Sequence, residues 1–122
     1  MNVQRLDFIG PDYVRRDADL AFAMTWRYAG VGIDLTGHVL EFKIRLADGS
    51  GAPIVTLDNA GNGGITLADQ ILYRGKAFYL LTQAQILAAL FTGVYSYTAR
   101  DLTGGGITPM WLGLIEFGGP AS

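Results

Sequence analysis

The sequence contains no cysteine and few charged residues, and both features narrow the functions that it can have. Without cysteine the chain forms neither a disulfide nor a thiolate metal site, and it has no cysteine nucleophile. Charged residues make up 16% of the chain, below the roughly 25% of an average soluble domain. Much of the surface is therefore uncharged or covered by a partner, and a covered surface favours a subunit of an assembly.

The chain also lacks a basic stripe and a long apolar run. Its 9 Lys and Arg against 11 Asp and Glu give a net charge of -2, and only Arg15 and Arg16 are adjacent. Nothing here matches the counterion-displacing surface of a nucleic-acid-binding protein. The first residues lack a signal-peptide profile, and no apolar run reaches the roughly 18 residues of a membrane span. We therefore expect synthesis in a cytoplasm, no nucleic-acid partner and no membrane contact.

What the sequence does contain is the two-residue alternation of β-strands. Alternating or β-branched segments predict strands over residues 6–9, 20–28, 38–46, 54–58, 65–67, 76–81, 93–100 and 110–117. Between the strands, Asp34, Thr36 and Gly37 form a polar corner that is expected to fix where the chain crosses between sheets. At 122 residues the chain is predicted to form one domain over 1–122, with frayed ends at 1–5 and 118–122.

A single short helix is predicted from Gln83 to Leu90. Thr82 is suited to its N-cap, and Gln85 stands where a capping box needs Glu or Gln. Three apolar side chains of the helix are expected to pack on the body of the domain: Ile86, Leu87 and Leu90. A parallel α/β fold would need crossover helices that the sequence lacks. The prediction is therefore an all-β fold, an antiparallel Ig-like β-sandwich of six to eight strands with this one helix.

No set of acid, base, nucleophile and ligand residues converges in the sequence. His38 is the only histidine, so it is expected to be structural or exposed. Asp12, Asp17 and Asp19 lie near each other but lack the ligand spacing and terminal Glu of an EF-hand loop, so a solvated loop is expected there. We therefore expect no enzyme, no catalytic residue, no metal and no cofactor.

The aromatic residues leave two interpretations open. They form either core and interface or a sugar-stacking platform, and strand positions favour the core. In addition, Tyr95 stands just after Gly93 at the start of a late strand, where a tyrosine corner would lie. The six aromatic residues concerned are Trp26, Tyr28, Tyr79, Tyr95, Tyr97 and Trp111.

Two strands carry candidate residues for a partner interface. In the strand over 38–46, the charged residues alternate with the apolar ones and are expected to point outward. The strand over 110–117 has apolar residues on both faces, so one face is expected to meet another subunit. The interface candidates are Glu41, Lys43, Arg45, Met110, Trp111, Leu112 and Leu114.

From about residue 12 onward, the order of several short segments resembles a family of small β-sandwich domains of tailed bacteriophages and prophages. The family includes the N-terminal domain of BppU-type upper baseplate proteins. Each motif is short, and the resemblance lies in their order. The segments are LAFAMTW (20–26), IDLTG (33–37), FKIR (42–45), GGITL (63–67), FYLLTQAQILAAL (78–90), GVYSY (93–97) and GLIEF (113–117).

This resemblance implies a structural virion protein of the tail, baseplate, fibre-attachment or neck region. Such a protein would bind other virion proteins, form a homo-oligomer and be made in the cytoplasm of a bacterial host. Segment 69–75 matches the family less well. The resemblance also admits a capsid decoration protein, and a different class, a carbohydrate-binding module that uses exposed Trp and Tyr to contact a glycan, remains the alternative.

Overall fold

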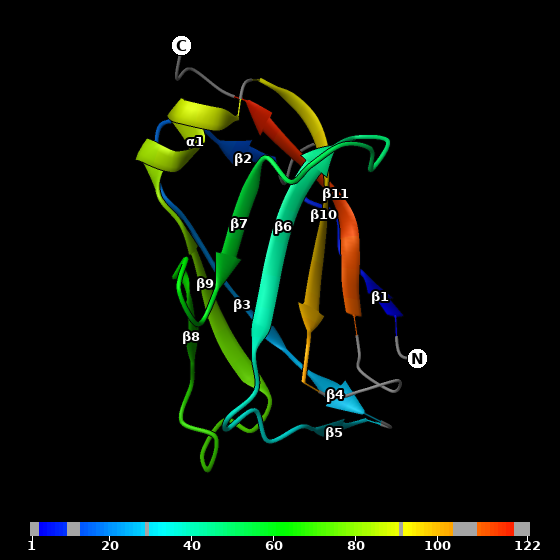
Figure 1. The fold of residues 1–122 in the computed structure, drawn as a ribbon, viewed down its shortest axis with the longest axis vertical. Coiled ribbons are helices and arrows are strands. Elements are labelled where there is room, and N and C mark those ends of the chain that lie inside the picture. Colours follow the sequence, from blue (N-terminus) through cyan, green and yellow to red (C-terminus); the bar gives the residue numbers. More distant parts are fainter. Residues whose placement is uncertain (1–2, 10–12, 29, 91, 104–109, 119–122) are drawn as a thin grey trace.

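The protein is described from a computed structural model, which describes residues 3–9, 13–28, 30–90, 92–103 and 110–118. These residues form a six-stranded sheet, a three-stranded sheet, a two-stranded hairpin and one short helix (Figure 1). The larger sheet runs in the order β1 (Val3–Arg5), β11 (Met110–Gly118), β10 (Gly93–Asp101), β6 (Leu40–Leu46) and β7 (Val55–Asp58), with β2 (Val14–Arg15) also beside β11. The smaller sheet runs β3 (Leu20–Thr25), β9 (Lys76–Leu81) and β8 (Ile65–Leu67).

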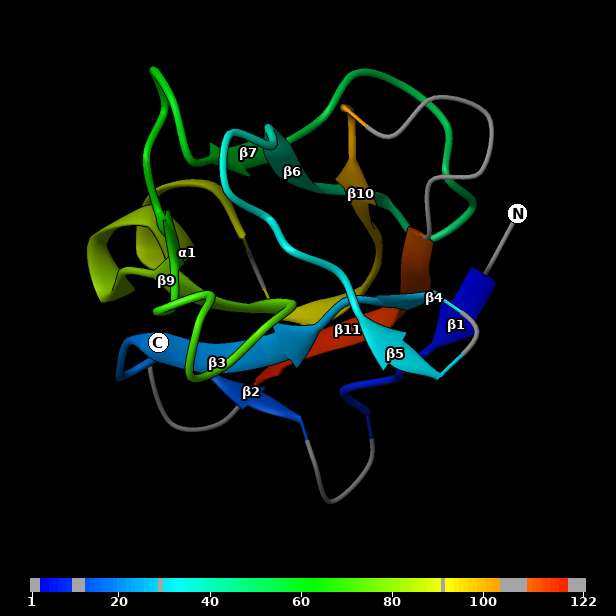
Figure 2. The same cartoon turned by 90° about the horizontal axis from the view of Figure 1, so that it is seen from below.

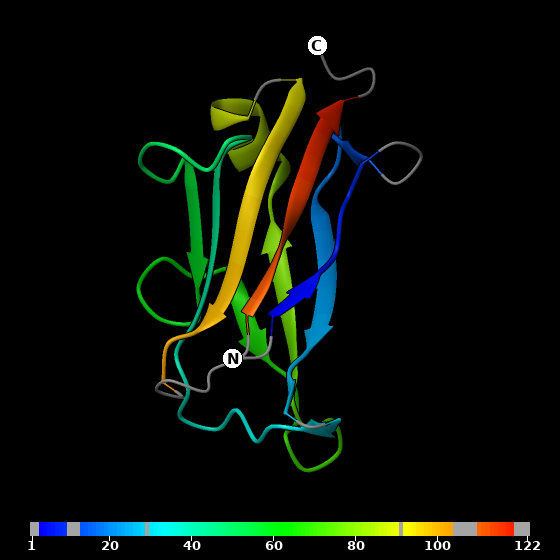
Figure 3. The same cartoon turned by 90° about the vertical axis from the view of Figure 1, so that its right-hand side faces the viewer.

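The predicted all-β fold is confirmed. The order β7–β6–β10–β11 in one sheet and β3–β9–β8 in the other corresponds to the C′–C–F–G and B–E–D strands of a variable-type immunoglobulin sandwich. Figure 3 shows β10 and β11 running side by side with β9 and β3 in a second layer behind them. The hairpin of β4 (Arg27–Tyr28) and β5 (Val31–Gly32) lies at one end, and Figure 2 looks along the strands from that end.

The alternation of the sequence places the core between the sheets. Phe42 of β6 contacts Phe22 and Tyr79 of the smaller sheet, with ring centroids 5.6 and 5.8 Å apart. Met24 and Trp26 are buried as predicted, while Ala21 and Ala23 on the opposite parity are exposed. Burial of these large apolar side chains is the main term that favours folding.

The helix α1 (Gln83–Ala89) begins where the sequence predicts. Thr82 accepts a hydrogen bond from the Gln85 backbone N–H, and the Gln85 side chain accepts one from the Thr82 N–H, which completes the capping box. Ile86 and Leu90 are buried, but Leu87 is 42% exposed, so the expectation that it packs on the body was wrong. None of the helices that the structure describes is long and apolar enough to cross a membrane.

The N-terminal part of the chain differs from the prediction. Residues 3–5 were expected to be frayed, yet they form β1, and Gly118 ends β11. Both β1 and β2 pair with β11 in parallel, whereas an antiparallel arrangement was predicted throughout. The expected strand over 6–9 is reduced to a bridge at Phe8, whose N–H donates to the Leu114 carbonyl at 2.9 Å. The β11 backbone supplies these hydrogen bonds. Segments this short have no alternation from which their pairing with β11 could be predicted.

Candidate functional site

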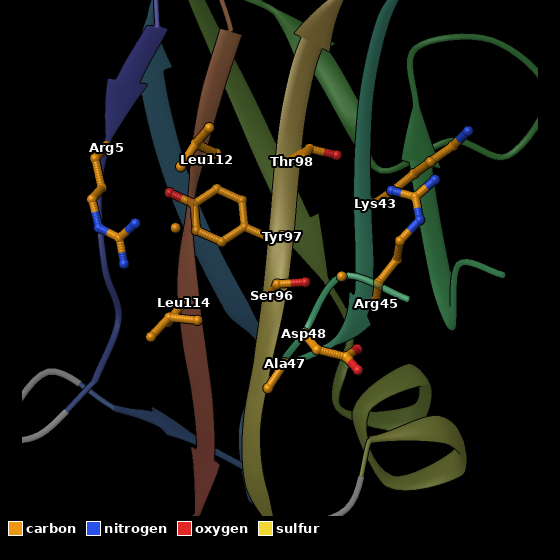
Figure 4. Close-up of a pocket in the computed structure, with 12 residues that line it drawn as sticks. Arg5, Lys43, Arg45, Ala47, Asp48, Ser96, Tyr97, Thr98, Leu112 and Leu114 are labelled. Carbon is orange, nitrogen blue, oxygen red and sulfur yellow. The ribbon is translucent and has the colours of Figure 1, made fainter. Parts of the chain in front are cut away.

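Four of the predicted interface residues come together in a hollow on the outer face of the larger sheet (Figure 4). Lys43 and Arg45 enter it from β6, and Leu112 and Leu114 enter it from β11. The hollow has a volume of about 350 Å³. We call this feature the outer hollow.

The register of β10 explains why these residues meet, because β10 lies between β6 and β11. Ser96 and Thr98, whose side chains face outward, each pair with one residue of β6 and one of β11. The result is two parallel rows that mix basic, hydroxyl and apolar side chains, Lys43–Thr98–Leu112 and Arg45–Ser96–Leu114. Cross-strand rows of this kind present a continuous surface to a partner.

The charges around the outer hollow are only partly balanced. Lys43 Nζ lies 3.1 Å from Glu41 Oε2, and Arg5 Nε lies 3.1 Å from Asp7 Oδ2. Arg45 is half-buried, and it has no ion pair or hydrogen bond with any residue that the structure describes. A guanidinium of this kind has donors available for a carboxylate of a partner.

The floor of the outer hollow is closely packed. The Tyr97 hydroxyl donates to the Leu6 carbonyl, and its ring stacks on Phe42 with centroids 5.2 Å apart. Burial raises the pKa of Tyr97 above its ordinary value, so the hydroxyl stays protonated. Beside it, a Cβ at Gly113 would collide with the Leu6 carbonyl oxygen, so the close approach of these two segments requires glycine.

Asp7 stabilises the same contact between the segment over 6–8 and β11. The Leu114 backbone N–H donates to Asp7 Oδ1 at 2.9 Å. This hydrogen bond, followed in importance by the hydrogen bond from Arg5, lowers the pKa of Asp7. Asp7 is therefore ionised near neutral pH, and the segment over 6–8 is tied to β11 at the edge of the outer hollow.

The other three predicted interface residues are placed differently. Glu41 is half-buried and reaches the hollow only through its pair with Lys43. Trp111 has the opposite parity to Leu112, and its half-buried ring packs against the core. Its indole Nε1–H is buried and finds no hydrogen-bond partner among the described residues. The side chain of Met110 lies outside the part that the structure describes.

Three of the six aromatic residues considered for a sugar-stacking platform are buried in the core. Trp26, Tyr79 and Tyr97 are at most 1% exposed, so their ring faces are not available to a glycan. The Trp26 Nε1–H instead donates to the Tyr79 hydroxyl at 3.1 Å. Tyr95 packs edge-on against Phe117 with ring centroids 5.8 Å apart, and a tyrosine-corner bond from its hydroxyl stays a prediction.

His38 joins two strand ends. Its Nδ1 lies 2.6 Å from Oδ2 of the buried Asp101, whose Oδ1 accepts a hydrogen bond from the Thr103 backbone N–H at 3.0 Å. The Thr103 hydroxyl in turn accepts one from the Val39 N–H at 2.9 Å. These bonds hold the residues before β6 against the end of β10, which is a structural role.

The two described aspartates of the segment that was considered for calcium bind different partners within the chain. Asp17 pairs with Arg15 at 2.6 Å, and Asp19 accepts a hydrogen bond from the Gln83 backbone N–H at 2.7 Å. Asp12 lies outside the described residues. Within the described part of the chain, no three acidic, histidine or cysteine side chains are grouped to hold a metal. Asp34 accepts two hydrogen bonds from Thr36 and forms the predicted turn.

The sequence interpretation missed one exposed feature, the connection between β8 and β9. Ile71, Leu72 and Tyr73 in this connection are 94, 70 and 55% exposed. The available signal was three large apolar residues between Asp69 and Gly75. A sequence does not distinguish such a triplet at a loop tip from one that is folded inward.

Comparison of the chain with family models and with curated proteins found no match. The outer hollow, the exposed β8–β9 connection and the order of the sequence motifs are therefore the features that point to a function.

Proposed function

We propose that this protein is a structural virion subunit that acts by binding other proteins rather than by catalysis. Its place would be in the tail, baseplate, fibre-attachment or neck region of a phage or prophage particle assembled in a bacterial cytoplasm. The observation that supports this proposal best is the outer hollow, where Lys43, Arg45, Leu112 and Leu114 form one surface. The phage assignment itself rests on the order of the sequence motifs.

The chemistry of the outer hollow suits a protein segment. The two leucines offer apolar contact, and the Arg45 guanidinium has donors available for a carboxylate. Interfaces between proteins commonly combine an apolar centre with arginine and a polar rim. We therefore expect a partner that presents an apolar side chain next to an Asp or Glu.

The two other roles that the sequence left open receive unequal support. A capsid decoration protein would also bind through such a surface and differs only in where it sits on the particle. A carbohydrate-binding module would need exposed rings, and Trp26 is completely buried while Trp111 packs against the core. Protein binding is therefore the better-supported function.

The test is mass spectrometry of particles purified from the strain that encodes the chain. We expect several copies of the chain per particle. The double variant Arg45→Glu, Leu114→Asp should be incorporated at least about tenfold less well, because it reverses the charge and removes the apolar contact. A matched control is Arg27→Glu, which changes an exposed arginine away from the outer hollow. Absence of the wild-type chain from particles would overturn the proposal.

A further inference from the structure

A second interaction surface lies at the end of the molecule opposite α1, where the chain turns from β8 to β9 (Figure 1). Ile71, Leu72 and Tyr73 form the tip of this turn, and we call them the apolar loop. They are 94, 70 and 55% exposed, and none of them is charged. Three adjacent large apolar side chains this exposed mark a site of contact with another molecule.

The apolar loop is held in one shape by its neighbours. Gln70 Oε1 accepts hydrogen bonds from the N–H groups of Leu35 and Gly75 at 3.1 and 2.9 Å. Its Nε2 donates to the carbonyls of Ala68 and Lys76 at 2.8 and 3.0 Å. Because one side chain makes four hydrogen bonds, the loop is organised before it meets a partner, and binding orders little additional structure.

Asp69 organises the tip itself. Its Oδ1 accepts hydrogen bonds from the Ile71 and Leu72 N–H groups at 2.9 and 3.3 Å. Its carbonyl accepts one from the Tyr73 N–H at 2.7 Å. The backbone N–H groups of the tip are thereby satisfied locally. The side chains of Ile71 and Leu72 are left exposed to a partner, and the Tyr73 ring lies beside them with Lys76 Nζ 5.3 Å from its centroid.

An apolar site of this kind exists on the same chain, on the outer face of the smaller sheet. It is a hollow of about 580 Å³ whose lining is uncharged, and we call it the apolar hollow. Cross-strand pairs there match a small side chain with a large one, Ala21 with Leu80 and Ala23 with Phe78. Phe78 and Leu80 are 45 and 42% exposed, and the Lys76 Nζ lies 5.3 Å from the centroid of the Phe78 ring.

We propose that the apolar loop of one copy of this protein binds in the apolar hollow of the next copy. One feature protrudes and the other is recessed, the side chains that form both are uncharged, and each remains exposed in the single chain. The Lys76 ammonium lies between them, 5.3 Å from the ring centroids of both Tyr73 and Phe78. The two surfaces are different, so the contact is heterologous and builds a ring where the rotation closes and a filament where it does not. This contact deepens the proposed function, since it identifies the surface that joins copies of the subunit.

Two variants, each damaging one surface, test the proposal by light scattering after size-exclusion chromatography. Leu72→Asp places a charge in the apolar loop, and Ala23→Glu places a charged side chain in the apolar hollow. The wild-type chain should self-associate as its concentration rises, and each variant alone should remain a monomer. An equimolar mixture should form a one-to-one dimer, because the intact loop of Ala23→Glu fits the intact hollow of Leu72→Asp and the chain of contacts then stops.

The matched control is Leu87→Asp, which gives the same substitution to an exposed leucine of α1 at the other end. It should self-associate like the wild type. Circular dichroism verifies folding, and Ile71→Asp with Ala21→Glu gives a second pair of variants.

Three results would overturn the proposal. The first is a wild-type chain that stays monomeric up to about 1 mM, where contacts with a Kd in the millimolar range become visible. The others are undiminished association of Leu72→Asp, and an equimolar mixture of the two variants that stays monomeric. Because incorporation into particles is measured separately, failure of this contact is distinguishable from failure of the proposed function.

Discussion

At the scale of single residues, Tyr97 connects the outer hollow with the core. Its hydroxyl donates to the Leu6 carbonyl while its ring stacks on Phe42. Tyr97→Phe keeps the ring but leaves the carbonyl without this donor, which should lower the free energy of unfolding by about 1 kcal/mol. Urea unfolding followed by fluorescence measures the change. Tyr73→Phe, at an exposed ring, is the control and should have no effect; an equal loss in both variants would contradict the prediction.

Two tyrosines also set the response of the protein to alkaline pH. Burial raises the pKa of Tyr79 and of Tyr97, so above about pH 10 the unfolded chain loses protons that the folded chain keeps. Below that pH the two tyrosines make their full contribution to the free energy of unfolding. Above it, each of them lowers the free energy of unfolding by about 1.4 kcal/mol per pH unit. Urea unfolding between pH 9 and 12 (a range of about three units) measures the slope. Tyr97→Phe should reduce it, and an unchanged slope in that variant would refute the assignment.

At the scale of elements, α1 depends on its first turn. Thr82→Ala removes one half of the capping box and should lower the free energy of unfolding by about 1 kcal/mol. The neighbouring Gln83→Ala is the control, because this side chain is exposed and only its backbone N–H bonds to Asp19. Chemical denaturation of both variants gives the comparison. A loss with Gln83→Ala as large as that with Thr82→Ala would show that the cap is not the cause.

Gln70 performs a comparable role for the apolar loop. Gln70→Leu removes four hydrogen bonds, so the N–H groups of Leu35 and Gly75 lose the acceptor that protects them. Hydrogen exchange at these two amides should become at least about tenfold faster, since local opening no longer breaks those bonds. Gln83→Leu serves as the control. Unchanged exchange at both amides would mean that packing rather than Gln70 holds the connection.

Long strands and the helix were readable from the sequence, and very short strands were not. The alternation over 40–46 predicted that Leu40, Phe42, Ile44 and Leu46 share one face. The first three are buried, but Leu46 at the end of the strand is 51% exposed. A strand of two or three residues has no period to detect, so β1, β2 and β5 went unrecognised, and β4 was joined to β3 in the single strand predicted over 20–28. Their positions depend on tertiary pairing, above all with β11, which local propensity does not encode.

The candidate sites divide in the same way. Parity placed Lys43 and Arg45 on the outward face of β6 and put Leu112 and Leu114 together on one face of β11, but only the pairing of β10 with both strands brings the four residues together. Parity did not decide which face of β11 meets the core, so Trp111 was named with the outward residues. Such a site is difficult to predict from the sequence, because the strands that form it lie far apart along the chain.

At the scale of the whole molecule, one chain of aromatic contacts joins the sheets. Phe8 and Phe42 of the larger layer both contact Phe22, which stacks on Tyr79 with centroids 5.0 Å apart. The two outer faces lie on opposite sides of this core and differ in chemistry. One carries the basic and apolar outer hollow, and the other carries the uncharged apolar hollow. Separate surfaces of this kind let a subunit bind its own copies and a different partner at the same time.

Two phenylalanines test whether the core and the assembly surface are independent. Phe42→Ala removes a completely buried ring that touches both sheets and should lower the free energy of unfolding by about 3–5 kcal/mol. A domain of this size has about 5–15 kcal/mol in total, so this variant should be close to unfolding. Phe78→Ala removes an exposed ring from the outer face of the smaller sheet and should change monomer stability by only about 0.5 kcal/mol.

The effect of Phe78→Ala should appear when self-association, rather than monomer stability, is measured. Phe78 lines the apolar hollow, so Phe78→Ala should weaken self-association while leaving the unfolding transition in place. Denaturant titration at low protein concentration gives the monomer stability, and sedimentation equilibrium of the folded variant gives the association. Equal destabilisation by the two substitutions would mean that the outer face of β9 belongs to the folding core, and the assembly role assigned to that face would then have to be abandoned.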